Sequence, residues 1–273
     1  MKTSFSSFSR DEKKEILELY KEGYTPTEIA ILMDIFPQEV VFCLRKMEVP
    51  LDLPKDVSQY EIPDEKVIII SDTHLGSKYE NLDYLREVYK MAHDEGIRTI
   101  LHGGDLIQST MSNVQPKYEN EMRQVEHVVI DYPYSKEIMN YILLGNHDYH
   151  TLRKHPIFLE TLQKRKDFNI LGFKRAYLTW LKELISLYHS TKKYPISIPS
   201  EETVLNLRGH SHILSYNKTN SINIPTLSDD LFVLRSGRPG FLVGTHKPGE
   251  IVLESYYFKN SLHYEGKILT KKL

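Results

Sequence analysis

Cysteine and long apolar runs are scarce in this sequence, and their scarcity excludes several classes of protein. The 273 residues include one cysteine, Cys43, so neither an internal disulfide nor a cysteine-rich zinc site can form. The longest apolar runs, such as 67–70, are far too short to span a bilayer. The N-terminus lacks the apolar stretch of a signal peptide. We therefore expect a reduced, cytoplasmic protein with no membrane partner.

An excess of charge of one sign is also absent. The formal net charge is -2, which indicates neither a nucleic acid nor an anionic membrane as a partner. Hydrophobic residues make up 40% of the chain and charged residues 26%, a balance typical of a packed globular core. The length fits one large domain, alone or with a small second one.

The chain does contain five clusters of oxygen and imidazole donors. In chain order they are Asp72-Thr73-His74, Gly104-Asp105, Gly145-Asn146-His147-Asp148, the single His189, and Gly209-His210-Ser211-His212. None of them supplies sulfur. Such donors suit a divalent metal centre that keeps positions open for water and phosphate.

The five clusters resemble the motifs of the calcineurin-like metallophosphoesterase superfamily. That pattern runs Asp-x-His, Gly-Asp, Gly-Asn-His-Asp/Glu, a lone His and Gly-His-x-His, and every element is present in order over the last three quarters of the chain. Isolated turn residues have no reason to follow this order. The resemblance implies an α/β fold, a four-layer sandwich of two packed mixed β-sheets flanked by helices. It also implies a hydrolase that acts on phosphate esters.

The resemblance further implies two divalent metal ions, with manganese as the family-based choice. Iron, zinc or nickel would accept the same mixed donors. Two ions roughly 3.5–4 Å apart deliver a hydroxide and neutralise the charge that develops on phosphate. Asp105 would bridge the ions, donating one oxygen to each. The first ion would take Asp72, His74, Asp105 and His212, and the second would take Asp105, Asn146, His189 and His210.

The third cluster also provides the expected catalytic pair. By the resemblance, His147 protonates the leaving oxygen, and Asp148 orients it and holds its positive charge. A positioned proton donor typically contributes about 10²–10⁴-fold to the rate.

His189 has no motif around it and is chosen by its position. It follows the apolar run 184–188, whereas His150 and His155 lie too soon after Asp148 to follow a separate strand. Taken singly, Asp72 and Asp105 could each be turn aspartates, and the histidines of the last cluster could be surface residues. The complete set favours the dinuclear centre.

Each cluster follows an apolar segment that is typical of a strand. The predicted strands are 66–71, 98–102, 138–144, 184–188 and 203–207, with a helix at 82–95 and a strand meander at 231–270. We therefore expect the ligands to gather on loops at one edge of a sheet, where open α/β sheets bind ligands.

The first 52 residues are expected to form a small all-α domain that resembles a helix-turn-helix. Apolar residues at helical spacing cover 10–47. A first helix is predicted to end at Gly23, a second to begin at Thr25-Pro26 and a third at Pro37. Residues 53–64 are predicted to be a linker, and 65–273 the metallophosphoesterase domain. In 1–54, ten acidic residues outnumber seven basic ones, whereas a DNA reader usually presents a basic face. Contact with DNA and a plain helical bundle both stay open, although Gln38, Arg45 and Lys46 could form a basic face.

The expected substrate is a nucleic acid. His74-Leu75-Gly76 extends the first motif in a way that resembles the double-strand-break-repair exonuclease branch, and also a branch that acts on lipid-linked sugar nucleotides. Together with the helical segment, this favours a phosphodiesterase acting on DNA, that is, a nuclease. The alternatives are a phosphomonoesterase or protein phosphatase, a nucleotide phosphodiesterase, and a DNA-binding regulator with a relic phosphoesterase domain.

Overall fold

The chain divides into two compact units, Met1–Tyr60 and Glu61–Leu273. A computed structural model describes residues 8–21, 24, 26–33, 35, 37–47, 49, 60–111, 114, 116–155, 157–189, 203–216, 220–229 and 238–273. The two units are described separately below.

The first unit contains the three helices that the sequence predicts. They are α1 (Arg10–Lys21), α2 (Pro26–Met33) and α3 (Pro37–Lys46). Ser9 and Glu12 form a reciprocal capping box at the start of α1, and prolines occupy the first positions of the other two helices. A small core contains Cys43 and the buried aliphatic residues Ile16, Ile29, Val40 and Leu44. The side chains of Gln38 and Arg45, two residues of the proposed basic face, lie outside the described residues.

The second unit contains a mixed seven-stranded sheet in the order β13-β12-β11-β2-β3-β4-β5. The parallel strands are β2 (Lys66–Ile70), β3 (Thr99–His102), β4 (Met139–Leu144) and β5 (Phe168–Phe173). The antiparallel meander predicted near the C-terminus consists of β11 (Gly240–Lys247), β12 (Glu250–Lys259) and β13 (Ser261–Lys272). β2 is almost wholly buried, as expected for a parallel strand covered on both faces.

A six-stranded mixed sheet has the order β1-β6-β7-β8-β10-β9. Its strands are β1 (Tyr60–Ile62), β6 (Arg175–Trp180), β7 (Glu183–His189), β8 (Leu205–Gly209), β9 (Ser215–Tyr216) and β10 (Ser221–Asn223). β7, β8 and β10 run parallel. β1 lies within the segment predicted as a linker, so the end of that segment belongs to the sheet instead. Residues 53–59 lie outside the described residues.

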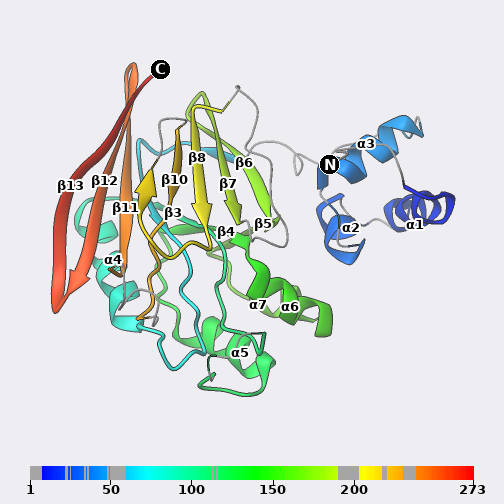
Figure 1. Cartoon of the computed structure of the whole chain (residues 1–273), viewed down its shortest axis with the longest axis horizontal. Coiled ribbons are helices and arrows are strands. Elements are labelled where there is room, and N and C mark those ends of the chain that lie inside the picture. The colour runs from blue at the N-terminus through cyan, green and yellow to red at the C-terminus, as the bar shows by residue number, and fades with distance from the viewer. Residues whose placement is uncertain are drawn as a thin grey trace. The chain divides into compact units, whose positions relative to one another are not determined.

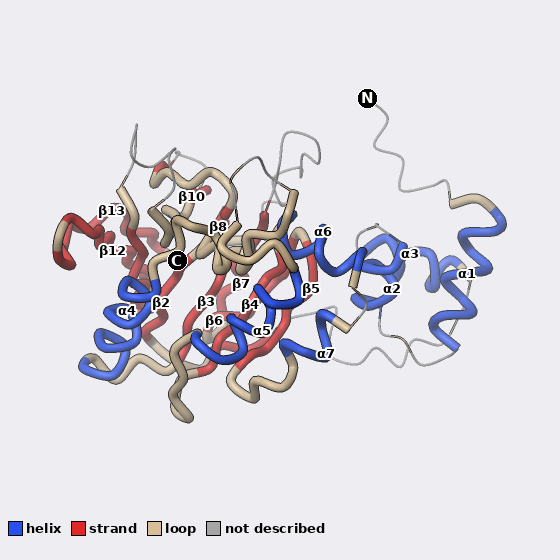
Figure 2. Tube along the Cα trace, turned by 90° about the horizontal axis from the view of Figure 1, so that it is seen from below, coloured by secondary structure: helices blue, strands red, loops and turns tan. Residues whose placement is uncertain are grey.

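The helices of this unit join consecutive parallel strands of the larger sheet (Figure 1). α4 (Leu82–Asp94) follows β2, α5 (Glu121–Asp131) follows β3, and α6 (Asn146–Lys154) and α7 (Phe158–Leu162) follow β4. Such crossovers are almost always right-handed, which places these helices on the same face of the sheet. Figure 2 shows the strands together, with the helices outside them. The predicted fold class, two mixed sheets flanked by helices, is confirmed. None of the described helices is both long and apolar enough to cross a membrane.

Trp180 on β6 links the two sheets. Its side chain is fully buried, and its Nε1 donates a hydrogen bond to the carbonyl of Asp64 at 2.7 Å. A Cβ at Gly244 on β11 would lie 2.8 Å from the Trp180 ring, so the glycine allows the indole to approach the other sheet. The core between the sheets therefore depends on this large side chain.

Replacing Trp180 with alanine should lower the free energy of unfolding by about 3–5 kcal/mol, because it leaves a cavity and an unpaired carbonyl. Urea denaturation followed by circular dichroism measures the change. As a control, Ile130→Ala removes a side chain that is 77% exposed and should change stability by less than about 0.5 kcal/mol. A similar small effect of both substitutions would contradict this account of the core.

Candidate metal centre

The seven predicted metal ligands come from the ends of both sheets. After β2, β3 and β4 of the larger sheet come Asp72 and His74, then Asp105, then Asn146 at the start of α6. His189 ends β7, and His210 and His212 follow β8, in the smaller sheet. The expectation of a single sheet edge is therefore wrong, because two packed sheets contribute to one site.

Unusual backbone geometry marks the residues of these turns. Five predicted ligands have left-handed φ angles: Asp72 (53°), His74 (45°), Asp105 (53°), His210 (75°) and His212 (61°). Residues other than glycine rarely adopt this region, and the conformational cost persists only where the surroundings enforce it. Such a cluster is typical of a functional site.

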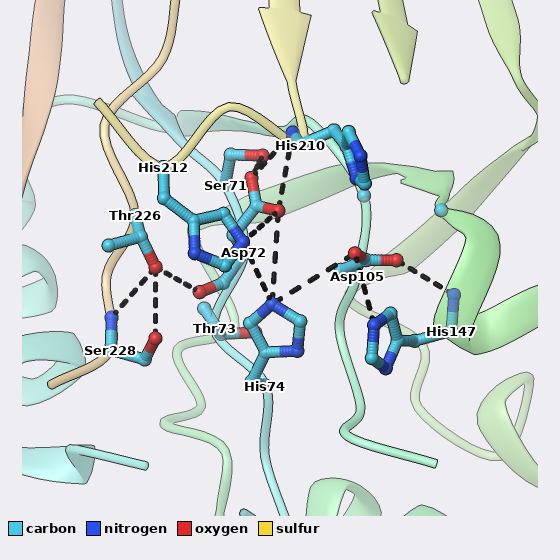
Figure 3. A network of polar contacts seen from close by, with 12 residues as sticks. Ser71, Asp72, Thr73, His74, Asp105, His147, His210, His212, Thr226 and Ser228 are labelled. Carbon is cyan, nitrogen blue, oxygen red and sulfur yellow. Dashed lines mark hydrogen bonds and ion pairs between the residues drawn. The ribbon is translucent and has the colours of Figure 1, made fainter. Parts of the chain in front are cut away.

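Asp72, His74 and His212 form the first ligand group. The Nε2 atoms of the two histidines lie 3.2 Å apart, and Asp72 Oδ1 lies 3.2 Å from His212 Nε2 and 3.9 Å from His74 Nε2. Figure 3 shows these side chains converging from two loops. One ligand atom from each of the three lies within 4.8 Å of the others, a spacing suited to holding one ion.

Asp105, His189 and His210 form the second group, again with ligand atoms within 4.8 Å of one another. His189 Nε2 lies 3.2 Å from Asp105 Oδ2 and 3.1 Å from the side-chain oxygen of Asn146. Asn146 therefore belongs to this group and adds a neutral oxygen donor.

The two oxygens of Asp105 have different surroundings. Oδ1 accepts the backbone N–H of His147 at 2.9 Å. Oδ2 is buried and accepts no hydrogen bond from any described residue, although it lies 3.2 Å from His189 Nε2 and 3.9 Å from His74 Nε2. Of the two oxygens of this predicted bridging carboxylate, Oδ2 is thus the one that lies near histidines of both ligand groups.

The contacts of His189 show that this centre needs a cation. Its Nδ1 donates to the carbonyl of Gly103 at 2.8 Å, so in the neutral ring the lone pair of Nε2 faces Asp105 Oδ2. Two acceptors at this distance require a positive charge between them, either a proton or a metal ion. The residues present therefore fit a divalent metal pair.

The family model for calcineurin-like phosphoesterases matches residues 65–269, about three quarters of the chain. The chain belongs to this family. It is thus a phosphoesterase, a hydrolase, and its buried histidine and aspartate groups are suited to two divalent metal ions.

Several solved structures are similar to this phosphoesterase at low sequence identity. YfcE, a phosphoesterase from E. coli, is 14% identical, with a TM-score of 0.48, and the match covers 74% of this chain and 98% of that one. Vps29 from Entamoeba histolytica, solved with zinc, is 12% identical (TM-score 0.43; 74% and 98%). Vps29 from Chaetomium thermophilum is 12% identical (TM-score 0.46; 76% and 96%). A search of curated proteins finds no match.

The protonation states in the phosphoesterase site suit metal binding. Burial and the neighbouring His147 lower the pKa of His74 to about 3, so its ring is neutral. Burial alone would raise the pKa of Asp72, but His212 holds it below the usual range. Burial would lower the pKa of His189, yet the Asp105 carboxylate outweighs it and raises the pKa to about 9. A metal ion must displace that proton, because only the neutral ring is a ligand.

A network beneath the ligands was not anticipated from the sequence. The backbone N–H of Gly104 donates to His102 Nδ1 at 3.2 Å, and His102 Nε2 lies 3.1 Å from Thr73 Oγ1. Thr73 donates to the carbonyl of Leu106 at 3.0 Å. This chain of contacts ties the Asp72 loop to the Asp105 loop. The position of Thr73 between two ligands was the only signal in the sequence.

His147 and Asp148 are both buried beside the centre, but their predicted pairing is wrong. The Asp148 carboxylate accepts backbone N–H groups from Leu106, Ile107 and Gly145 at 2.8–3.1 Å. His147 instead donates from Nδ1 to the carbonyl of Gln108, and its Nε2 lies 4.0 Å from Asp105 Oδ2. Asp148 therefore joins the two ligand loops and does not orient the imidazole.

Replacing Asp105 with asparagine should weaken metal binding by at least about a hundredfold, because it removes the charge that both groups share while keeping the shape. The retained metal is measured by mass spectrometry after dialysis, with circular dichroism to verify folding. Asp94→Asn, at a side chain that is 62% exposed, is the matched control and should change nothing. Full retention of metal in Asp105→Asn would show that this carboxylate is not a shared ligand.

Proposed function

We propose that this phosphoesterase hydrolyses phosphodiester bonds and that its substrate is DNA, which would make it a nuclease. The observation that carries the hydrolytic part is Asp105 Oδ2, one buried oxygen that faces both ligand groups and His147. When bound, two divalent ions would supply an activated water and neutralise charge on the phosphate. We propose manganese first, with zinc, iron or nickel as alternatives that the same donors accept.

His147 is proposed as the acid that delivers a proton to the leaving oxygen. Its ring is held at Nδ1 by the Gln108 carbonyl, which turns Nε2 toward Asp105 and the centre. His189 is held in the same way, by the carbonyl of Gly103, but its Nε2 lies against Asn146 and Asp105 within the second ligand group, which leaves His147 as the proposed donor. A donor held in this way contributes about 10²–10⁴-fold to the rate.

Support for DNA comes from the three short successive helices of the first unit, a pattern that resembles a helix-turn-helix. The extension of the first motif, His74-Leu75-Gly76, gives weaker support for DNA as the substrate. Gly76 has a φ of 83°, and a Cβ there would lie 2.6 Å from the Gln124 side chain, so local packing alone requires this glycine. The leading alternatives are therefore a phosphomonoesterase, a protein phosphatase and a nucleotide phosphodiesterase. The complete ligand set disfavours a regulator with a relic domain.

Manganese-supplemented protein should hydrolyse bis(4-nitrophenyl) phosphate and labelled DNA, and Asp105→Asn should lose at least about a hundredfold of both activities. 4-Nitrophenyl phosphate, a monoester, is the comparison substrate. Hydrolysis of the monoester alone would reject the nuclease and favour a phosphomonoesterase. Hydrolysis of the small diester without DNA would favour a nucleotide phosphodiesterase. No hydrolysis at all, with DNA still bound, would favour the regulator.

Removal of residues 1–54 should weaken DNA binding by about tenfold. It should also reduce the slope of affinity against salt concentration, because fewer phosphates would be neutralised. Fluorescence anisotropy on the Asp105→Asn background measures affinity without cleavage, and the truncation leaves β1 intact. An unchanged affinity and salt slope would reject a role for the helical unit in DNA binding.

A further inference from the structure

Helix α5 presents two buried polar side chains to the loop that follows Asp105. Glu121 is 4% exposed and Gln124 is fully buried. Gln124 Oε1 accepts the backbone N–H of Ser109 at 2.7 Å, and Glu121 Oε1 accepts that of Thr110 at 2.9 Å. Two successive backbone N–H groups of the loop are thus held by one helix.

The loop needs such support, because Ser109 has a left-handed φ of 57°. The hydroxyl of Thr110 also donates to Glu121, and Ser109 Oγ accepts the N–H of Met111 at 3.1 Å. On the other side of the turn, the N–H of Gln108 donates to the carbonyl of Leu75 at 2.9 Å. The Gln108 carbonyl therefore lies between anchored neighbours.

The Gln108 carbonyl is the group that accepts from His147 Nδ1. This hydrogen bond selects the ring orientation in which Nε2 faces the metal centre, 4.0 Å from Asp105 Oδ2. An uninterrupted series of contacts thus runs from α5 through 108–110 to the imidazole.

Side chains of α6 and of the residue just beyond it surround Glu121, and Lys154 supplies the positive charge. Lys154 Nζ lies 3.2 Å and His150 Nε2 3.8 Å from Glu121 Oε1, and His155 Nε2 lies 3.3 Å from Oε2. Because α6 begins at Asn146 and His147, these contacts also fix the helix that carries the imidazole.

We propose that Glu121 and Gln124 are positioning residues for proton donation by His147. They act through the Ser109–Thr110 backbone and the Gln108 carbonyl, and neither contacts the metal ligands. The proposal rests on the proposed function, in which His147 donates the proton. A displacement of about 1 Å in a reacting group can cost about a hundredfold in rate, so the loop's position bears directly on turnover.

Gln124→Ala deletes the acceptor for Ser109, whereas Gln124→Glu keeps an acceptor and loses the hydrogen bond from Nε2 to the carbonyl of Tyr118. Gln163→Ala, at an exposed glutamine after α7, is the matched control. Glu121→Ala deletes the acceptor for Thr110 and is matched by Glu126→Ala, at an exposed position of the same helix. Every variant is studied as the full chain, with circular dichroism and metal content as checks on folding.

The first readout is the leaving-group dependence of turnover on a pair of phosphodiesters that carry phenyl or 4-nitrophenyl groups. Protonation matters more for the phenyl ester, because phenolate is the poorer leaving group. We expect Gln124→Ala and Glu121→Ala to lower turnover of the phenyl ester about ten- to a hundredfold, with less than about threefold loss on the nitrophenyl ester and unchanged KM. Gln124→Glu should recover part of the loss, because it restores the acceptor for Ser109, and both controls should match the native chain.

The second readout does not need activity. Nitrogen-15 NMR of histidine side chains in the zinc-loaded chain should show His147 with hydrogen on Nδ1, and Gln124→Ala should make the ring a mixture of tautomers. An unchanged tautomer together with equal losses on both esters would overturn the proposal. If the native chain hydrolyses neither ester, the proposed function fails, while the NMR comparison still decides whether α5 positions the ring.

Discussion

The centre depends on one electrostatic constraint: a buried carboxylate oxygen faces imidazole nitrogens and requires a positive charge, either a proton or a metal ion, between it and them. Asp105 Oδ2 lies 3.2 Å from His189 Nε2, whose other nitrogen already donates to a carbonyl. Without a cation, this arrangement would cost the full penalty of an unsatisfied buried charge. A proton on His189 can remove this penalty, in agreement with the raised pKa of that ring. A divalent ion held by the ligand groups can remove it as well.

The fold creates this constraint through turns that are themselves strained. Left-handed residues follow β2, β3 and β8, and small residues allow the loops to touch. A Cβ at Gly145 would lie 2.2 Å from Asp105 Oδ1, and one at Gly209 would lie 2.3 Å from the carbonyl of Gly103. Packing of the two sheets, with Trp180 between them, holds these loops together. Conformational cost in the loops is thus offset by burial in the core.

The surroundings of His147 suit a site that receives an anionic ester. Its ring is oriented by a neutral main-chain carbonyl, while the charge of Asp148 is directed to backbone N–H groups of the ligand loops. The imidazole is therefore fixed without placing another carboxylate against it. Glu121, the other buried acid near the loop, is balanced by Lys154, whose Nζ lies 3.2 Å from Oε1.

Local pattern in the sequence was enough to predict the donor types, their order and the strands that precede them, because ligand chemistry and apolar periodicity are properties of short segments. The three N-terminal helices and the C-terminal meander were predictable for the same reason. β1, β5, β6, β9 and β10 were not predicted as strands, since such short segments become strands only by pairing with a neighbour. The tertiary structure alone decided that two sheets share the site, that one oxygen of Asp105 faces both groups, and that Gln108 holds His147. Those choices rest on contacts between residues that are distant in sequence, such as His147 with Gln108 and Ser109 with Gln124, which no local pattern encodes.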